Sequence, residues 1–346
     1  MRPARRQGVG SPTPAVELPP PSNRVRSVEA PPDQRTPRPE SRWADLEGPV
    51  HYLDFGGPSD GPLVVCVHGL GGSALNWAAV APTLAQTCRV VAIDLAGFGH
   101  TLGGSRATSV QANNRLLHRF LVEVAGTPAI LVGNSMGGLI SIRQAARRAE
   151  TVAGLVLVDP ALPPALRARP DPKAFAMFAA FMVPVLGRRV ARRPRDEASA
   201  VRSARDLLAL CCADPSRIPP EILALHAELA GQRLEYPDVD SEMLTAAQSL
   251  LWVLADRRRY AAMLREIDVP VLLLHGDQDR LINIAAARAA AAANPHWQFE
   301  VAQGVGHVPQ LEVPQWTIDV VLGWLAAHPD VADLASQSTT SVPKRR

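Results

Sequence analysis

Short runs of apolar, often β-branched residues recur along this chain, and segments with helical periodicity separate them. The runs are LVVCV (63–67), RVVAID (89–94), AILVG (129–133), GLVLVD (154–159), VPVLLLHG (269–276) and WQFEVA (297–302). A strand that is apolar on both faces needs cover on both sides, which crossover helices supply in a parallel sheet. The pattern therefore predicts an α/β fold, with a mostly parallel sheet flanked by helices.

The expected helices fall near 74–86, 109–125, 137–149, 284–293 and 314–327, and an alternating stretch at 50–55 predicts one more strand. The pattern breaks after Asp159-Pro160, because residues 161–262 contain helical stretches such as Pro220–Leu229 but no clear buried strand. We therefore predict one core, residues 46–160 and 263–328, into which a helical cap at 161–262 is inserted.

The two ends of the chain lack the apolar residues that a packed core needs. Residues 1–45 are rich in Pro, Arg and Ser, and residues 329–346 end in SQSTTSVPKRR, so both are expected to be disordered. The leader has no continuous apolar stretch typical of a signal peptide. No segment reaches the roughly 20 apolar residues of a membrane-spanning helix.

The charge and the cysteine content of the chain limit the binding partners and the cellular compartment that the sequence predicts. The net charge is +3, and the arginines cluster in the leader and at 188–195 without interleaved aromatic residues, which argues against nucleic-acid binding. Cys66, Cys88, Cys211 and Cys212 show no spacing that suits a zinc site. These features predict a reduced, cytoplasmic protein.

The turn after the first apolar run has two incompatible interpretations. Residues 69–74 (GLGGSA) fit the dinucleotide fingerprint G-x-G-x-x-G/A, and Asp94 ends the next strand, where a ribose-binding acid is expected. Led by His68, the same turn could instead offer backbone N–H groups to the oxyanion of an acyl-transfer reaction.

A second glycine cluster favours acyl transfer. Residues 133–137 (GNSMG) match G-x-S-x-G and lie between an expected strand and an expected helix. A serine at such a turn sits in strained backbone above the carboxyl edge of the sheet, and the N–H of Met136 and the helix N-terminus point at whatever bonds to its oxygen. Gly133 and Gly137 are required because a Cβ there would collide with the neighbouring chain.

A nucleophilic Ser135 needs a base, and the base needs an orienting acid. Asp277 and Asp279 follow the strand at 269–276, and His307 follows the strand at 297–302. In a parallel sheet all these strand ends meet at one edge, so the order Ser, Asp, His places three catalytic side chains together. From the residues alone, either Asp277 or Asp279 could be the acid.

With these motifs in place, residues 50–328 resemble the α/β-hydrolase superfamily, specifically its cofactor-free members with a helical cap. Residues 68–72 (HGLGG) are similar to the family's oxyanion turn, 94–101 (DLAGFGHT) to its D-x-P-G-x-G-x-S turn, 276–279 (GDQD) to its acid turn, and 306–312 (GHVPQLE) to its G-H-x-x-x-x-E segment. Ala96 and Thr101 depart from that pattern, where proline and serine are usual.

The resemblance implies a role for particular residues. Ser135 would be the nucleophile, His307 the base, Asp279 its acid partner, and the Leu70 and Met136 N–H groups the oxyanion hole. It implies no cofactor and no metal. His68, His275 and Asp94 are expected to be structural, as hydrogen-bonding partners inside the fold.

The expected substrate is a small to medium, largely apolar carboxylic ester. Serine at this position argues against dehalogenase and epoxide hydrolase chemistry, in which a carboxylate attacks carbon. Two alternatives stay open: a carbon–carbon bond hydrolase of diketone-like ring-fission products, and a non-catalytic ligand-binding protein of this fold. The cap residues Phe175, Met177, Phe178, Phe181 and Met182 predict either an apolar pocket wall or packing of the cap onto the core, and beside the arginines at 188–195 they suggest transient contact with a membrane surface.

Overall fold

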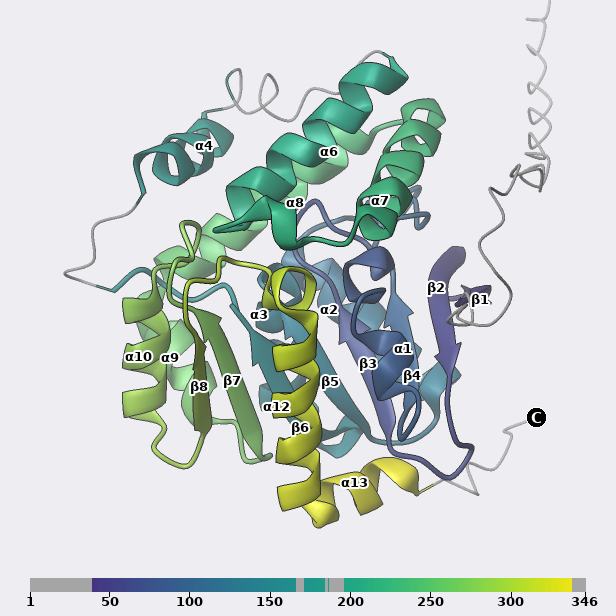
Figure 1. Ribbon diagram of the computed structural model, residues 1–346, viewed down its shortest axis with the longest axis vertical. Helices are drawn as coiled ribbons and strands as arrows, with labels where there is room; N and C mark the ends of the chain where they lie inside the picture. Colours follow the sequence, from purple (N-terminus) through teal and green to yellow (C-terminus); the bar gives the residue numbers. More distant parts are fainter. Residues whose placement is uncertain (1–38, 166–170, 184–185, 187–195, 338–346) are drawn as a thin grey trace, which may run out of the picture. The chain divides into compact units, whose positions relative to one another are not determined.

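The computed structural model describes residues 39–165, 171–183, 186 and 196–337 (Figure 1). Within them an eight-stranded sheet has the order β1-β2-β4-β3-β5-β6-β7-β8, in which the β1–β2 and β2–β4 pairs are antiparallel and the other pairs are parallel. The strands are β1 (Glu40–Asp45), β2 (Pro49–Gly56), β3 (Leu63–Val67), β4 (Arg89–Ile93), β5 (Ala129–Asn134), β6 (Val152–Val158), β7 (Val271–Gly276) and β8 (Gln298–Ala302). The predicted fold class is confirmed.

The sheet is buried because both of its faces are covered by helices. Along β3, Val65 and Val67 face one core cluster, whereas Val64 and Cys66 face the other, as the two-residue period of a strand requires. The first face is covered by α2 (Val110–Phe120), α3 (Met136–Arg147), α9 (Arg257–Arg265) and α10 (Ile284–Ala293). The second is covered by η1 (Ala74–Trp77), α1 (Ala81–Leu84), α12 (Pro314–Ala327) and α13 (Pro329–Ser336).

Both ends of the core extend further than the sequence pattern predicted. Residues 40–45, expected to be disordered, form β1, which pairs with β2 from Glu40↔Asp54 to Asp45↔Pro49. Its side chains are mostly exposed, so backbone pairing holds this edge strand and no apolar pattern marks it. The rest of the predicted leader, residues 1–38, lies outside the described residues.

The predicted disordered tail is also wrong over its first residues. α13 runs from Pro329 to Ser336 and buries Val331 and Ala335 against the second face of the sheet. Two small apolar side chains in a single short helix are too few to give a clear amphipathic pattern. Residues 338–346 lie outside the described part of the chain.

The chain between β6 and β7 forms helices that lie over the carboxyl edge of the sheet (Figure 1). They are α4 (Pro172–Met182), α6 (Glu197–Cys211), α7 (Pro220–Gln232) and α8 (Val239–Ala255). The predicted boundary at residue 262 cuts through α9, which packs on α3 in the core and carries the buried Tyr260, Met263 and Leu264. The Tyr260 hydroxyl donates to the Ala161 carbonyl, so both ends of the insertion are tied together.

Hydrogen bonds fasten the cap to the loop that follows β4. The Arg233 guanidinium donates to the carbonyls of Gly97 and Gly99, and the carboxylate of Glu242 accepts from the Gly103 N–H at 2.7 Å. The Thr108 hydroxyl donates to the Glu242 carbonyl at 2.9 Å. Among the described helices, none is both long and apolar enough to cross a bilayer.

Candidate active site

Ser135 occupies the turn between β5 and α3, and its backbone is strained. It has φ 54° and ψ −119°, a region that non-glycine residues rarely adopt. The flanking glycines explain how the turn closes. A Cβ on Gly133 would lie 2.7 Å from the Gly137 carbonyl oxygen, and a Cβ on Gly137 would lie 2.2 Å from that of Val67. The turn can therefore hold Ser135 in this geometry only with small residues on both sides.

His307 and Asp279 meet at the carboxyl ends of β7 and β8. The Nδ1 of His307 lies 2.7 Å from Oδ2 of Asp279, and both side chains are buried. Asp279 is fixed in turn by the N–H groups of Leu281 and Ile282, which donate to its Oδ1 at 2.7 and 3.0 Å. Asp277 instead accepts from the Gly304 N–H at 2.6 Å. The structure thus pairs Asp279, and not Asp277, with the histidine.

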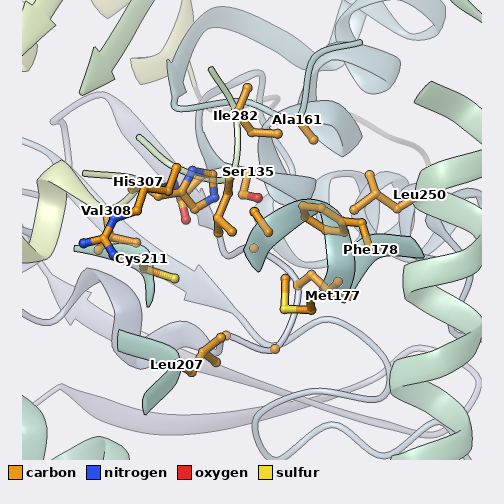
Figure 2. A pocket seen from close by; sticks show the side chains of 18 of the residues that line it. Ser135, Ala161, Met177, Phe178, Leu207, Cys211, Leu250, Ile282, His307 and Val308 are labelled. Carbon is orange, nitrogen blue, oxygen red and sulfur yellow. Dashed lines mark hydrogen bonds between the residues drawn. The ribbon is translucent and has the colours of Figure 1, made fainter. Parts of the chain in front are cut away.

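Ser135 and the His307–Asp279 pair line one pocket of about 1010 Å³. Figure 2 shows Ser135 and His307 close to each other in this view, with Phe178 and Leu250 further to the right. An Nδ1–H that donates to Asp279 leaves the Nε2 of a neutral His307 as a proton acceptor. The pocket therefore holds a hydroxyl, a candidate base and an acid that orients the base.

The turn after β3 passes beside Ser135. A Cβ on Gly69 would lie only 2.9 Å from the Ser135 Cβ, so the Gly69–Leu70 backbone approaches the serine closely. Met136 is the first residue of α3, and its N–H has no acceptor within the helix. His68 holds the turn: its Nδ1 lies 2.7 Å from the Gly69 carbonyl oxygen, and its Nε2 accepts from the Leu95 N–H at 3.1 Å.

The same turn does not have the form of a dinucleotide site. Its residues lead into η1, a single four-residue 3-10 helix whose N-terminal N–H groups are capped by Ser73. Asp94, the candidate ribose ligand, is buried and accepts hydrogen bonds from the Ala74 N–H, the His100 N–H and the His51 ring. Its carboxylate oxygens are thus occupied by the protein itself.

Charge around the buried acids sets their protonation. Burial alone would raise the pKa of Asp279, but the electrostatic interaction and hydrogen bond with His307, the nearby His275 ring and the Ile282 N–H outweigh it and hold that pKa below its usual value. Burial lowers the pKa of His275, whose Nε2 lies 2.8 Å from the Ile282 carbonyl. Asp279 is therefore ionised and His275 neutral at neutral pH.

Asp159 is a further buried acid in this cluster, and sequence reasoning gave it no role. It has φ 44°, accepts from the Gly276 N–H at 2.9 Å, and lies 3.5 Å from Nδ1 of His275. Burial and the negative charge of Asp279 raise the pKa of Asp159 well above its usual value, which favours its protonated form. The available signal was its position, since it follows β6 at the edge where the other acids lie.

Three of these side chains also have the spacing of metal ligands. Single atoms of Asp159, Asp279 and His307 lie within 4.8 Å of one another. The Nδ1 of His307 and Oδ2 of Asp279, however, are 2.7 Å apart and share a hydrogen bond. A proton already joins the two atoms that would bind an ion, so this cluster suits proton transfer better than metal binding.

The cap supplies most of the apolar surface of the pocket. Phe178, Met177 and Phe181 of α4 line it, together with Leu250 and Leu254 of α8. The expectation that the apolar run of α4 forms a pocket wall is therefore confirmed, whereas the helix that α4 packs on, α8, belongs to the cap itself and not to the core. The arginines at 188–195 lie outside the described residues.

Comparison with known proteins gives this geometry a family. The model of the alpha/beta hydrolase fold family matches residues 62–314. The chain belongs to this family. Ser135 of this α/β-hydrolase lies inside the matched range, as do Asp279 and His307.

Individual relatives of this α/β-hydrolase are distant but cover most of it. Monoacylglycerol lipase ABHD6 of Homo sapiens is 23% identical over 290 residues, which span 80% of this chain and 81% of the relative. Lipase 1 of Psychrobacter immobilis is 26% identical over 273 residues, 78% of each chain. The solved structure of a thermophilic esterase from Thermogutta terrifontis matches with a TM-score of 0.60 at 24% identity, covering 83% of this chain and 98% of the esterase.

Proposed function

We propose that this protein is a serine hydrolase that cleaves a small to medium, largely apolar carboxylic ester. The observation that carries the proposal is the shared pocket: a strained Ser135 opens into the same cavity as a His307 ring that is hydrogen-bonded to a buried Asp279. The lipases and esterases among the family relatives support the same reaction class.

The proposed reaction has two halves that use the same groups. Ser135 Oγ attacks the ester carbonyl while His307 Nε2 accepts its proton, and the imidazolium is stabilised by Asp279. The oxyanion is held by the N–H groups of Leu70 and Met136. The proton then passes from His307 to the leaving alcohol, and a water activated by His307 releases the acid from Ser135.

The pocket supports an apolar acyl group. Its volume of about 1010 Å³ and its wall of Phe, Met and Leu side chains suit a chain of several methylene groups, each worth about 0.8 kcal/mol when it leaves water. The position of α4 and α8 over the carboxyl edge supports acyl binding between cap and core (Figure 1).

The test is hydrolysis of p-nitrophenyl esters from acetate to palmitate by wild type and Ser135→Ala. We expect kcat/KM to rise with chain length from acetate to a maximum at medium length. Ser135→Ala should lower kcat by about 10,000-fold or more, because it removes the nucleophile. A folded wild type that turns over none of these esters, or a Ser135→Ala variant as active as wild type, would contradict the proposal.

We also propose that the cap makes transient contact with a membrane surface. On and just after α4, Phe175 is 61% exposed, Val183 51% and Leu186 44%, although α4 also lines the pocket. Exposed apolar side chains beside a pocket mouth suit a lipid interface. Co-sedimentation with anionic liposomes at low salt should carry wild type down and should weaken for Phe175→Ser, and an absence of wild-type binding would remove the proposal.

A further inference from the structure

Outside Ser135, His307 and Asp279, most polar side chains that line the pocket have hydrogen-bond partners. These are Ser73, bonded to the Leu75 N–H; Asn76, to the Ser73 N–H; Asn134, to the Val158 and His307 carbonyls; Asp171, to the Lys173 and Ala174 N–H groups; Arg233, to the Gly97 and Gly99 carbonyls; Asp277, to the Gly304 N–H; Arg280, to the Cys212 carbonyl; and Asn283, to the Ala285 N–H. Two more, Ser203 and Gln278, belong to exposed residues that water can satisfy.

His226 of α7 differs from all of these. Its Nε2 is buried and, among the described residues, hydrogen-bonds to nothing, although the residue lines the pocket. It lies one helical turn from the buried Ile222 and from Leu229, on the stripe that faces inward. A buried polar atom without a partner is costly to folding, and native proteins rarely keep one without a reason.

The protonation state of His226 decides what it can recognise. Burial lowers its pKa to about 4, so the ring is neutral at neutral pH. A neutral imidazole offers one donor and one acceptor, and carries no charge to attract a carboxylate or a phosphate. The group that matches Nε2 is therefore a neutral hydroxyl, which can donate or accept.

The pocket has an apolar side on α4 and α8, whereas α7 contributes His226 beside the apolar Leu229 and Ala230. Phe178 and Met177 of α4, with Leu250 of α8, form an apolar wall without polar side-chain atoms other than sulfur. His226 comes from α7, the helix that also contacts η1, directly after the turn that carries Leu70. If the acyl chain of an ester packs against the apolar side chains of α4 and α8, its alcohol portion lies toward α7 and His226.

From this arrangement we infer that His226 binds a free hydroxyl on the alcohol portion of the substrate, which makes the protein selective for monoacyl esters of a polyol. The inference rests on the proposed ester hydrolysis and names its substrate class. His226 acts in binding and takes no part in proton transfer at the ester.

The experiment compares two esters with one acyl group, 1-monooctanoylglycerol and methyl octanoate. In His226→Phe, kcat/KM for monooctanoylglycerol should fall about 3- to 10-fold, the worth of one neutral hydrogen bond, whereas methyl octanoate should be cleaved as by wild type or faster. His226→Gln keeps a donor and an acceptor and should retain the preference. Leu225→Ala, at the neighbouring and exposed position of α7, is the matched control and should change neither ester.

A binding measurement separates this inference from the proposed reaction. 1-O-octylglycerol and octyl methyl ether have no ester to cleave, and calorimetry should show that His226→Phe weakens binding of the glycerol ether alone. If wild type hydrolyses neither ester but this difference in binding appears, the proposed hydrolysis fails and the hydroxyl site stands. If His226→Phe changes both members of each pair by the same factor, or neither, the hydroxyl site is wrong.

Discussion

The carboxyl edge of the sheet and the cap above it are built by different means. At the edge, residues of the core hold the catalytic candidates: Asp279 accepts from the Leu281 and Ile282 N–H groups, and the Asn134 side chain donates to the His307 carbonyl at 3.1 Å. In the cap, α4 leaves Phe175 61% exposed and α7 leaves the Nε2 of His226 without a partner. This difference shows that the core fixes the reacting groups, whereas the cap leaves an exposed apolar side chain and an unpaired polar atom that are available to a ligand.

The largest effect should come from the acid at the sheet edge. Asp279→Asn should lower kcat by about 10,000-fold, because an amide can stabilise neither the required tautomer nor the imidazolium. The measurement is steady-state ester hydrolysis with circular dichroism to verify folding.

The matched control for Asp279 lies two residues away on the same loop. Asp277→Asn removes the same charge, but Asp277 contacts the Gly304 N–H and not the histidine. Its kcat should stay within about threefold of wild type. Equal losses in the two variants would mean that the loop as a whole matters and that the pairing with His307 has no special role.

The next largest effect is expected at the strained turn, where Gly137 packs closely against the Val67 backbone. Gly137→Ala places a Cβ 2.2 Å from the Val67 carbonyl oxygen, so it should cost about 1–3 kcal/mol or more of unfolding free energy. Gly323→Ala, in α12 with open space around its Cβ, should stabilise by up to about 1 kcal/mol. Urea denaturation measures both, and a neutral Gly137→Ala would refute the tight packing of the turn.

A cap substitution should have a smaller and more selective effect. Phe178→Ala removes part of the apolar wall, so kcat/KM should fall about 10-fold for octanoate and little for acetate. The comparison is made with p-nitrophenyl esters. Leu334→Ala, at an exposed apolar position of α13 outside the cap, serves as control. A uniform loss for all chain lengths would show that Phe178 positions the cap and does not contact the acyl chain.

The smallest effect is expected for Asp159, the buried acid beside His275 and Asp279. Because the pKa of Asp159 is raised in the folded protein, stability from this group is complete below its unfolded pKa of about 4 and is lost as pH rises through the folded value. Asp159→Asn cannot ionise, so its Tm relative to wild type should increase with pH above about 4 by about 1–3 °C. A difference in Tm that is independent of pH would show that Asp159 is ionised in the native state.

Prediction from sequence succeeded where burial on both faces dominates. The predicted strands at 63–67 and 129–133 correspond to β3 and β5, and the predicted helix at 314–327 is α12. These elements are apolar for their whole length or on one regular face, so local pattern and tertiary packing agree.

Elsewhere the deciding contacts are not local. The expected helix at 74–86 is instead η1 and α1, because Ser73 and Asn76 form a capping box and Pro82 lies in the first turn of a separate helix. β1 exists because β2 offers it backbone partners. Chemistry at the sheet edge could be predicted from strand order, whereas the place of His226 depends on how α7 packs over the core, which no local pattern records.

The central claim is that Ser135 is a nucleophile activated by His307. The most direct measurement is mass spectrometry of the protein after reaction with a fluorophosphonate probe, for wild type and His307→Ala. The account predicts one adduct, on the peptide that carries Ser135, and labelling at least about 1,000-fold slower in His307→Ala. A folded wild type that takes no label, or takes it on another residue at the same rate in both proteins, would contradict the account.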